Sequence, residues 1–279
     1  MPDLFHDVRL AARLLLRHRA YSAIVVLTLA LGVGANSAIF TVINVVMLRP
    51  LPFQDSGRLV LLSLDTADPT AGVYRGTYEA LSADPHSFDR LAVFYRAGFS
   101  QVTLTGAGEP EPAQGGFVST DFFQLLGVLP SVGRTLTADD EAHHNRVVVL
   151  SAKLWRERFN SARDVIGRTI RVDGISSEIV GVMPATFQFP TSATQFWAPI
   201  STNRLWNDPA VDIKDSNRSR GFYARWTILG HLRPGATLAS VGSEVNLIER
   251  RLARSNPIVD PNAALHAVSL KAEIGRAHV

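Results

Sequence analysis

Five residues near the middle of the sequence carry the groups best suited to metal chemistry. Asp139, Asp140 and Glu141 are followed closely by His143 and His144. Carboxylates and imidazoles are common ligands of divalent cations, so metal binding is the chemistry that this cluster could support. Adjacent histidines do not readily aim at one ion, and the spacing matches no familiar ligand set. We therefore interpret the cluster as a solvated loop and predict no metal site.

Other residues that could act in catalysis lack the sequence context that catalysis needs. His86 lies near Asp84 and Asp89, but no nucleophile in a recognisable elbow accompanies it. Gly106 and Gly108 lack the strand-to-helix context of a dinucleotide loop, and no phosphate-binding GxxxxGKS or GxxxxGKT motif occurs. The absence of cysteine excludes disulfides, thiolate catalysis and cysteine-ligated zinc. We predict no catalytic residue and no cofactor, so the chain is not expected to be an enzyme.

The composition argues against nucleic acid as a partner. The 279 residues include 28 Lys and Arg against 25 Asp and Glu, a net charge of +3. Four arginines lie within the first nineteen residues, so the excess is largely N-terminal. No basic face with interleaved aromatic residues is visible. With 46% hydrophobic residues the chain can bury the core of one or two domains.

The elements that must position these residues follow from about Leu59 onward. Aliphatic runs at 58–64 and 146–151 predict strands. Ser119 or Thr120 is expected to cap a short helix that Gly127 ends. Thr137 and Asp140 have capping-box spacing, which predicts another helix start.

The second half of the sequence continues this pattern. Ser151 is expected to cap a helix that runs to about Phe159. Asp173-Gly174 separates two β-rich runs and predicts a tight hairpin. The segment 225–232 alternates as a half-buried strand should, and Thr237 is expected to cap the helix that follows. Hairpins in the middle and strand–turn–helix units at the end predict an α+β domain with two lobes. The four tryptophans, Trp155, Trp197, Trp206 and Trp226, are expected in the core or at the lobe interface.

Residues 20–48 carry no charged side chain. As a helix this segment would span about 43 Å, against about 30 Å for the hydrocarbon core of a membrane. A cleaved signal peptide is the alternative, but the apolar run continues past the small residues at 35–38 that could offer a cleavage site. We therefore predict a transmembrane helix over 20–48. The arginines before it predict a cytoplasmic N-terminus and an extracytoplasmic domain.

One face of this helix is predicted to pack against other helices. Small and polar residues recur at helical spacing, and such residues let helix backbones approach closely in lipid. A plain anchor with incidental small residues is the alternative. The predicted packing face is Ala23, Ala30, Gly34, Ser37, Thr41 and Asn44.

Residues 1–19 are predicted to form a cytoplasmic amphipathic helix next to the membrane. Arg9, Arg13 and Arg17 repeat every four residues on one side, with apolar residues on another. This pattern is typical of a helix that lies on an anionic lipid surface. A short solvated helix is the alternative.

The sequence also resembles a known family over nearly all of its first 250 residues. The similarity covers the N-terminal run through "NSAIFTVINVVMLRPLPF" and continues in order through "FVSTDFFQLLGVLPSVGRTL", "VVVLSAKLWRERF", "VIGRTIRVDGISSEIVGVMPATFQFP", "FWAPI" and "LGHLRPGATLASV". These segments resemble MacB-like and FtsX-like ABC transporter permeases. The similarity points to the duplicated-permease branch seen in acidobacteria and related soil bacteria.

The resemblance implies a first transmembrane helix followed by a MacB-like periplasmic core domain at 49–272. One lobe, similar to the porter subdomains of tripartite pumps, would be built from both ends of this segment. A β-rich lobe would be inserted between them. The resemblance also implies a bacterial inner membrane location, a cytoplasmic ABC ATPase as partner, further helices of the same permease, and a homodimer or pseudo-dimer in contact with lipid.

The sequence departs from this family at its end. No second hydrophobic span follows Leu48, and residues 273–279 break the family character. These last residues resemble a translated sequencing adapter, so we expect a non-native tail on a fragment of a longer permease.

Two hypotheses on function remain open from the sequence, with a third as a minor alternative. The first is the N-terminal part of a non-catalytic permease subunit that couples a partner ATPase to movement of the extracytoplasmic domain. The second is a single-pass, membrane-anchored sensor or ligand-binding module. An anchored hydrolase is unsupported by any catalytic motif.

Overall fold

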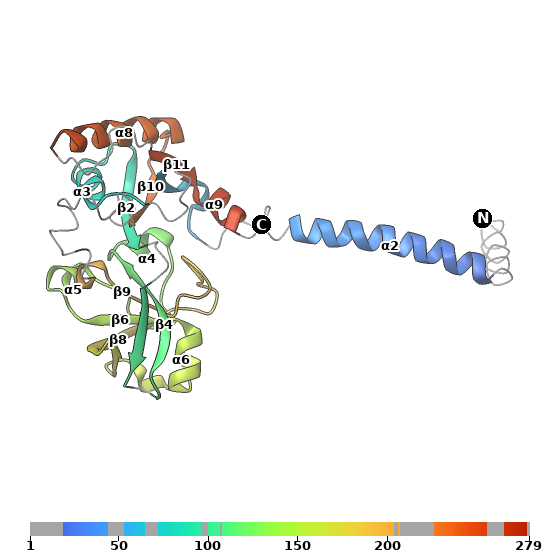
Figure 1. Cartoon of the computed structure of the whole chain (residues 1–279), viewed down its shortest axis with the longest axis horizontal. Coiled ribbons are helices and arrows are strands. Elements are labelled where there is room, and N and C mark those ends of the chain that lie inside the picture. The colour runs from blue at the N-terminus through green and yellow to red at the C-terminus, as the bar shows by residue number, and fades with distance from the viewer. Residues whose placement is uncertain are drawn as a thin grey trace, which may run out of the picture. The chain divides into compact units, whose positions relative to one another are not determined.

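The computed structural model describes residues 19–43, 53–64, 72–95, 100–106, 108–203, 206, 226–255 and 265–277. The chain divides into two compact units, and each is described by itself (Figure 1). The first contains residues 1–50 and 277–279, and the second contains Leu51–Arg276. The second unit holds both lobes.

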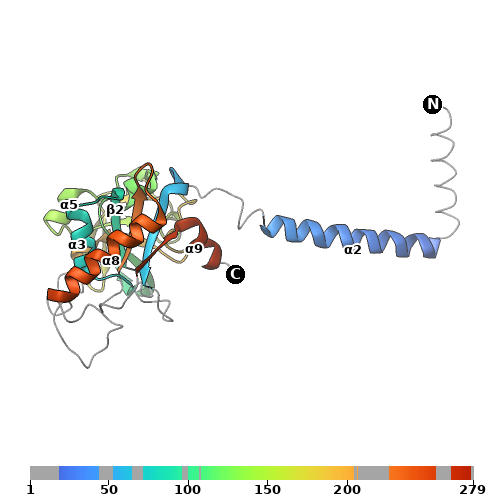
Figure 2. The same ribbon diagram turned by 90° about the horizontal axis from the view of Figure 1, so that it is seen from above.

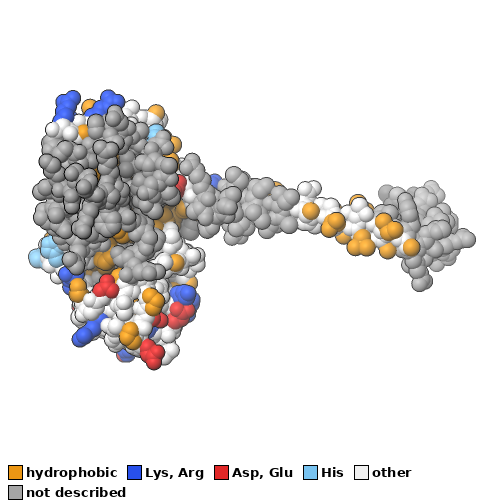
Figure 3. All heavy atoms as spheres, viewed as in Figure 1, with side chains coloured by type: hydrophobic (Ala, Val, Ile, Leu, Met, Phe, Trp, Pro, Cys, Tyr) orange, Lys and Arg blue, Asp and Glu red, His pale blue; other side chains and the backbone are white. Residues whose placement is uncertain are grey.

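Helix α2 (Arg19–Ile43) is the described element of the first unit and has 25 residues. Its described large hydrophobic side chains, such as Leu27 and Leu31, are exposed. Figure 3 shows hydrophobic side chains along the described part of this helix. Within the part of the chain that the structure describes, no helix combines the length and apolar character that crossing a membrane needs.

The first lobe is an antiparallel sheet in the order β11–β1–β10–β2. Its strands are β1 (Leu59–Leu64), β2 (Phe88–Tyr95), β10 (Trp226–Leu232) and β11 (Leu265–Ser269). Helices α3 (Arg75–Ala83) and α8 (Leu238–Ser255) contact each other over one face (Figure 2). Helix α4 (Phe122–Leu126) covers the other face through β2 and β10. Helix α9 (Leu270–Ala277) follows β11.

The inserted lobe is a closed ring of six strands in the order β4–β3–β7–β8–β6–β9. The ring closes because β9 pairs in parallel with β4, from Gly115↔Phe196 to Val118↔Pro199. Its strands are β3 (Ser100–Thr105), β4 (Glu111–Val118), β6 (Val147–Leu150), β7 (Thr169–Val172), β8 (Ile175–Val182) and β9 (Phe196–Pro199). The two-residue strand β5 (Val132–Gly133) pairs with β8 outside this path.

Small and large side chains fill the interior of the ring together. A Cβ on Gly115 would lie 2.2 Å from Cζ of Phe196, so only glycine leaves room for that ring. Helix α6 (Ala152–Phe159) places Leu154 and Phe159 in the interior cluster with Leu150 and Val182. Since Leu150 ends β6 and Val182 ends β8, α6 covers the end of the ring where these strands finish.

Several local predictions are confirmed. Thr137 and Asp140 form a capping box at the start of α5 (Ala138–Ala142). The hydroxyl of Ser151 accepts a hydrogen bond from the N–H of Leu154. Thr237 and Ser240 bond reciprocally at the start of α8. Asp173 and Gly174 join β7 to β8 with φ angles of 50° and 79°.

Two other predictions are wrong. Helix α4 begins at Phe122 after Asp121, and the hydroxyl of Ser119 instead accepts the N–H of Val93 on β2. Strand β10 is buried along both faces because it is central in its sheet, so its alternation does not produce a solvent face. In the segment expected to be a non-native tail, residues 273–277 belong to α9, and Ile274 packs against the core. Its non-native origin stays a prediction.

Candidate functional site at the junction of the two lobes

The predicted packing face lies partly within the described residues. Ala23, Ala30, Gly34 and Ser37 are exposed on α2, and a Cβ on Gly34 would meet no described residue within 4 Å. The side chain of Thr41 lies outside the described residues, as do Asn44 and the basic residues Arg9, Arg13 and Arg17. The packing face and the basic face therefore stay predictions.

The acidic–imidazole cluster lies around α5, and its two imidazoles point to different partners. Nδ1 of His143 is 3.0 Å from Oδ1 of Asp139, whereas Nδ1 of His144 is 3.2 Å from the carbonyl oxygen of Ser201. Among the described residues, no three histidine or carboxylate side chains form a group that could hold a metal ion. The interpretation of the cluster as a solvated loop is wrong, because its three acidic residues belong to α5 and Asp140 is buried. The cluster organises hydrogen bonds around that carboxylate.

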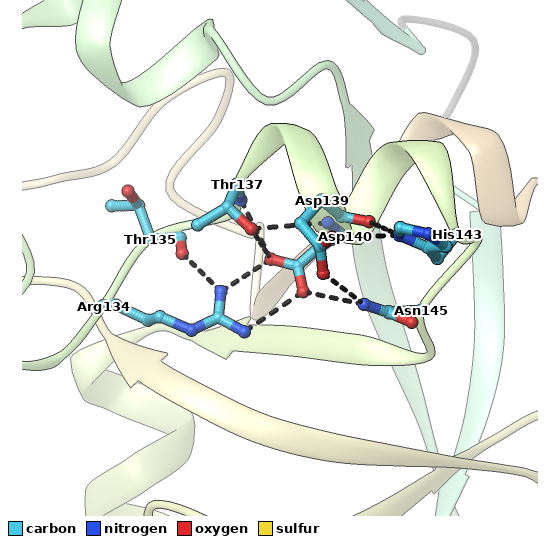
Figure 4. Close-up of polar contacts among 7 residues, drawn as sticks. All are labelled: Arg134, Thr135, Thr137, Asp139, Asp140, His143 and Asn145. Carbon is cyan, nitrogen blue, oxygen red and sulfur yellow. Dashed lines mark hydrogen bonds and ion pairs between the residues drawn. The ribbon is translucent and has the colours of Figure 1, made fainter.

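That carboxylate belongs to Asp140, which is 2% exposed (Figure 4). Arg134 binds it through both terminal nitrogens, at 2.6 and 3.1 Å. The backbone N–H and the hydroxyl of Thr137 also donate to it, at 2.9 and 2.8 Å. Burial opposes ionisation of Asp140, but these donors outweigh it and hold the pKa of the carboxyl below its ordinary value. These hydrogen bonds hold the first turn of α5 in place.

Helix α5 in turn contacts the segment that leads into α4. The N–H of Thr120 donates to Oε2 of Glu141 at 3.0 Å. Thr120 lies between β4 and α4, and α4 covers the sheet of the first lobe. Glu141 therefore connects α5 of the inserted lobe to the segment before α4, and α4 covers the sheet of the first lobe.

A second link joins β2 directly to the end of β4. Phe94 pairs with Val118, and the next residue, Ser119, bonds Val93 twice. The N–H of Ser119 donates to the carbonyl of Val93 at 2.8 Å, and its hydroxyl accepts the N–H of Val93 at 3.0 Å. Hydrogen bonds between buried groups such as these fix the register at the junction.

An aromatic cluster fills the space between the lobes. Phe94 of β2 lies 5.7 Å from Phe122 of α4 and 5.6 Å from Phe189, which follows β8. Phe122 and Phe189 stack at 5.7 Å, and Phe123 meets Trp197 of β9 at 5.9 Å. All five side chains belong to one buried cluster that includes residues of both lobes. Since interiors pack as densely as crystals, a shared core couples the lobes mechanically.

A further aromatic group lies where the chain returns from the inserted lobe. Trp206 meets Trp226 of β10 edge to face at 4.8 Å, and the guanidinium of Arg75 lies 5.0 Å over the Trp206 ring. Arg75 also donates to the carbonyl oxygen of Trp206. Trp226 in turn meets Tyr95 of β2 at 5.1 Å. Helix α3 therefore holds Trp206 against the first lobe.

The junction has the character of a rigid coupling rather than of a catalytic centre. Its contacts are aromatic packing, paired charges and backbone hydrogen bonds. Of the four tryptophans expected in the core or at the lobe interface, Trp197, Trp206 and Trp226 are buried. Trp155 is partly buried and packs against the interior cluster of the ring. Sequence reasoning missed Phe187 and Phe189, although the close spacing of two phenylalanines before Pro190 was a visible signal. The contact of Glu141 with Thr120 had no local signal.

Residues 22–248 match the family described as the MacB-like periplasmic core domain. The chain belongs to this family. The match begins inside α2 and ends inside α8, so it includes the inserted lobe and most of the first lobe. The second unit is thus the periplasmic core domain of a MacB-like ABC transporter permease.

Solved structures share the fold of this MacB-like domain. The periplasmic region of MacB from Actinobacillus actinomycetemcomitans aligns with a TM-score of 0.57 at 14% identity, over 80% of this chain and 93% of that one. A domain of a putative permease from Porphyromonas gingivalis gives 0.57 at 15%, over 78% and 93%. The extracellular domain of the noncanonic ABC-type transporter YknZ from Gram-positive bacteria gives 0.52 at 15%, over 75% and 99%.

Two curated relatives match shorter segments of the sequence. The macrolide export ATP-binding/permease protein MacB of Chromobacterium violaceum is 30% identical over 98 residues, 34% of this chain and 15% of the relative. The protein of the same name from Shigella dysenteriae serotype 1 is 28% identical over 127 residues, 42% of this chain and 20% of the relative. The matched segments therefore span a fifth or less of each relative.

Proposed function

We propose that this chain is the N-terminal part of a non-catalytic permease subunit in an ABC-type export or mechanotransmission complex. The family match over 22–248 carries the proposal. Residues 20–48 would cross the bacterial inner membrane with the N-terminus in the cytoplasm. The support for this crossing is the uncharged run, which extends past the described end of α2 at Ile43.

The partners in this proposal are a cytoplasmic ABC ATPase, further helices of the same permease, and a second permease copy or half. ATP binding by the ATPase would rearrange the membrane helices and move the periplasmic domain between two arrangements. The shared aromatic core supports movement of the two lobes as one body. Arg9, Arg13 and Arg17 would hold the N-terminal helix on anionic lipid.

The membrane orientation is tested with single cysteines, because the natural sequence has none. His18→Cys precedes the uncharged run, and Leu247→Cys replaces a 60% exposed side chain on α8. A maleimide that cannot cross the inner membrane should label Leu247→Cys in intact spheroplasts. It should label His18→Cys only after lysis. The opposite pattern, or equal labelling of both, would overturn the orientation.

The coupling is tested on the complete permease with its ATPase. Spin labels on Leu247→Cys of two permease copies report the distance between their periplasmic domains. We expect this distance to change when ATP binds. Labels on Leu247→Cys and Ile175→Cys of one copy should keep a constant distance. An unchanged distance between copies would contradict the coupling role and leave the anchored-sensor hypothesis standing.

A further inference from the structure

The six-stranded ring is covered by α6 at one end and carries a pocket at the other. All strand residues that line this pocket come from the same end of the ring, where β3, β6 and β8 begin and β4, β7 and β9 finish. The pocket has a volume of about 440 Å³. Volumes of this size are typical of sites for small molecules.

The wall of the pocket is apolar because it continues the inward-facing rows of the ring. Side chains alternate along a strand, so residues two apart from the interior cluster also face inward. On β8, Ile175 and Ser177 precede the interior residue Ile179 in this way. The other inward-facing wall residues are Val102, Phe117, Val148, Val172 and Ala198.

Two observations distinguish this wall from ordinary core. Ile175 faces the pocket yet is 44% exposed, so the apolar wall is open to solvent within the described part of the chain. The hydroxyl of Ser177, a residue only 6% exposed, adds one polar group to the apolar wall. An apolar wall with few polar groups is the usual composition of a ligand site.

The rim supplies a fixed positive charge. Arg146 is exposed beside the pocket, and its Nη1 donates to the carbonyl oxygen of Thr202 at 3.2 Å. A guanidinium has five N–H donors, so donors remain for a ligand. The acidic rim residue, Asp173, has one carboxylate oxygen occupied by the N–H of Thr103 at 2.7 Å. Arginine binds carboxylates through two parallel hydrogen bonds, which makes an anionic group the matching ligand feature.

We propose that this open end of the ring binds a small amphipathic acid, with its apolar body against the wall and its carboxylate on Arg146. At about 30 Å³ per water-sized group, the pocket has room for about fifteen non-hydrogen atoms. The proposal names a ligand class that the permease role does not supply, and it holds whether or not the chain acts with an ATPase.

The test uses Ile175→Cys as a reporter in the full chain, held in nanodiscs. The probes are 4-phenylbutyrate, 4-phenylbutanol and 4-phenylbutylamine, which share one apolar body and differ in the charge of the head group. We expect 4-phenylbutyrate to slow maleimide labelling of Ile175→Cys at least threefold, with saturation in the low millimolar range. The alcohol should protect more weakly and the amine least.

Leu247→Cys is the matched control, because it is also an exposed apolar position but lies on α8. Its labelling rate should not respond to any of the three probes. Adding Arg146→Gln to Ile175→Cys should abolish the preference for the acid over the alcohol while both still protect. If Ile175→Cys does not fold, Thr202→Cys on the rim serves as the reporter.

Three results would overturn the proposal. The first is an unchanged labelling rate with all three probes up to their solubility. The second is equal slowing at Leu247→Cys, which would indicate a non-specific effect. The third is retained acid preference in the Arg146→Gln variant, which would remove the arginine from the site. None of these results depends on membrane orientation, so failure here is distinguishable from failure of the permease proposal.

Discussion

Asp140 is the residue on which the polar contacts of the inserted lobe converge. It closes the capping box of α5, binds Arg134 through two nitrogens and is almost fully buried. A buried carboxylate with these donors stabilises the folded state only while it is ionised. Replacing it therefore tests whether α5 is held by this charge.

Asp140→Asn is expected to lower the stability by about 1–3 kcal/mol at pH 7, because the charged pairing with Arg134 is lost. Thermal unfolding by circular dichroism measures the change. Asp164→Asn is the control, since Asp164 also pairs with an arginine, Arg168, but is exposed. That variant should melt as the natural protein does. Equal effects in both variants would contradict a special role for Asp140.

The pH dependence of the same comparison follows from the direction of the pKa shift. The pKa of Asp140 is lower in the folded state than its ordinary value. Its contribution is therefore present above about pH 4, the ordinary value for aspartate, and is lost as the pH falls toward the lower folded pKa. The difference between the natural protein and Asp140→Asn should shrink below about pH 4.

The pKa of Glu249, which lies where α8 contacts α3, is shifted in the opposite direction to that of Asp140. Glu249 is 2% exposed, the hydroxyl of Thr77 donates to its Oε1, and its Oε2 has no hydrogen-bond partner among the described residues. Burial raises the pKa of this carboxyl above its ordinary value. The folded state therefore holds the proton more tightly than the unfolded state, and stability is lost as the pH rises from the ordinary value through the folded pKa.

Glu249→Gln is expected to stabilise the protein at pH 7 by about 1 kcal/mol, because it removes a buried group that resists ionisation. At about pH 4 the variant and the natural protein should be equally stable. Melting temperatures across this pH range test the sign. The exposed Glu157→Gln on α6 is the control and should follow the natural protein. A destabilised Glu249→Gln at pH 7 would contradict the prediction.

At the scale of single elements, α2 offers a comparison of two glycines. Gly32 and Gly34 are both exposed, and a Cβ on either would meet nothing within 4 Å in the part of the chain that the structure describes. They lie about 200° apart around the helix, and Gly34 alone is on the predicted packing face. The same substitution at both positions therefore separates packing from any general effect on the helix.

Gly34→Leu should reduce association with the remaining permease helices about tenfold, since bulk at a small-residue contact keeps backbones apart. Gly32→Leu should leave association unchanged. Co-purification of the separately tagged halves of the complete permease gives the measurement. If both variants assemble normally, the packing face is wrong.

The elements also show which parts of the fold the sequence could predict. The hairpin at Asp173-Gly174 and the caps at Thr137 and Ser151 depend on neighbours within a few residues, so local signals were sufficient. The start of α4 was misplaced because Ser119 bonds to β2, which is distant in sequence. The two-sided burial of β10 and the pairing of β4 with β9 have the same cause. Both features depend on pairing between strands that are distant in sequence, and no local sequence pattern encodes that pairing.

The candidate site also combines features that the sequence could predict with features that it could not. Three of the four tryptophans expected in the core or at the lobe interface are buried, and Trp155 is partly buried. The role of Asp140 was only half visible: its spacing from Thr137 predicted the capping box, but its pairing with Arg134 was not anticipated. The pocket at the end of the ring could not be predicted, because it exists only after β4 and β9 close the ring.

At the scale of the whole folded domain, the shared aromatic core predicts that the two lobes unfold together. Phe122 is fully buried where residues of both lobes meet. Phe122→Ala should lower the stability by about 3–5 kcal/mol. Environment-sensitive labels on Leu247→Cys and Ile175→Cys report the first and the inserted lobe. Both labels should give the same unfolding midpoint, and Phe122→Ala should shift both equally.

Phe159→Ala sharpens this test, because Phe159 belongs to the interior cluster of the ring. If the lobes are one cooperative unit, this variant also shifts both labels. A shift confined to the label on the inserted lobe would show that the lobes unfold independently.

Tyr95 and Trp226 are paired neighbours on β2 and β10, so the chain leaves for the inserted lobe and returns from it at one place in the ladder. Insertions or deletions between these residues need not disturb the register of β1, β10 and β2. The parts between them that must be kept are those that pack on the first lobe: α4, which covers the sheet, and Phe189 and Trp206, which meet Phe94 and Trp226. Evolution can therefore lengthen or remodel the ring while inheriting the first lobe unchanged. Length differences among homologues should gather between these two residues, and the four-stranded sheet should stay constant in size.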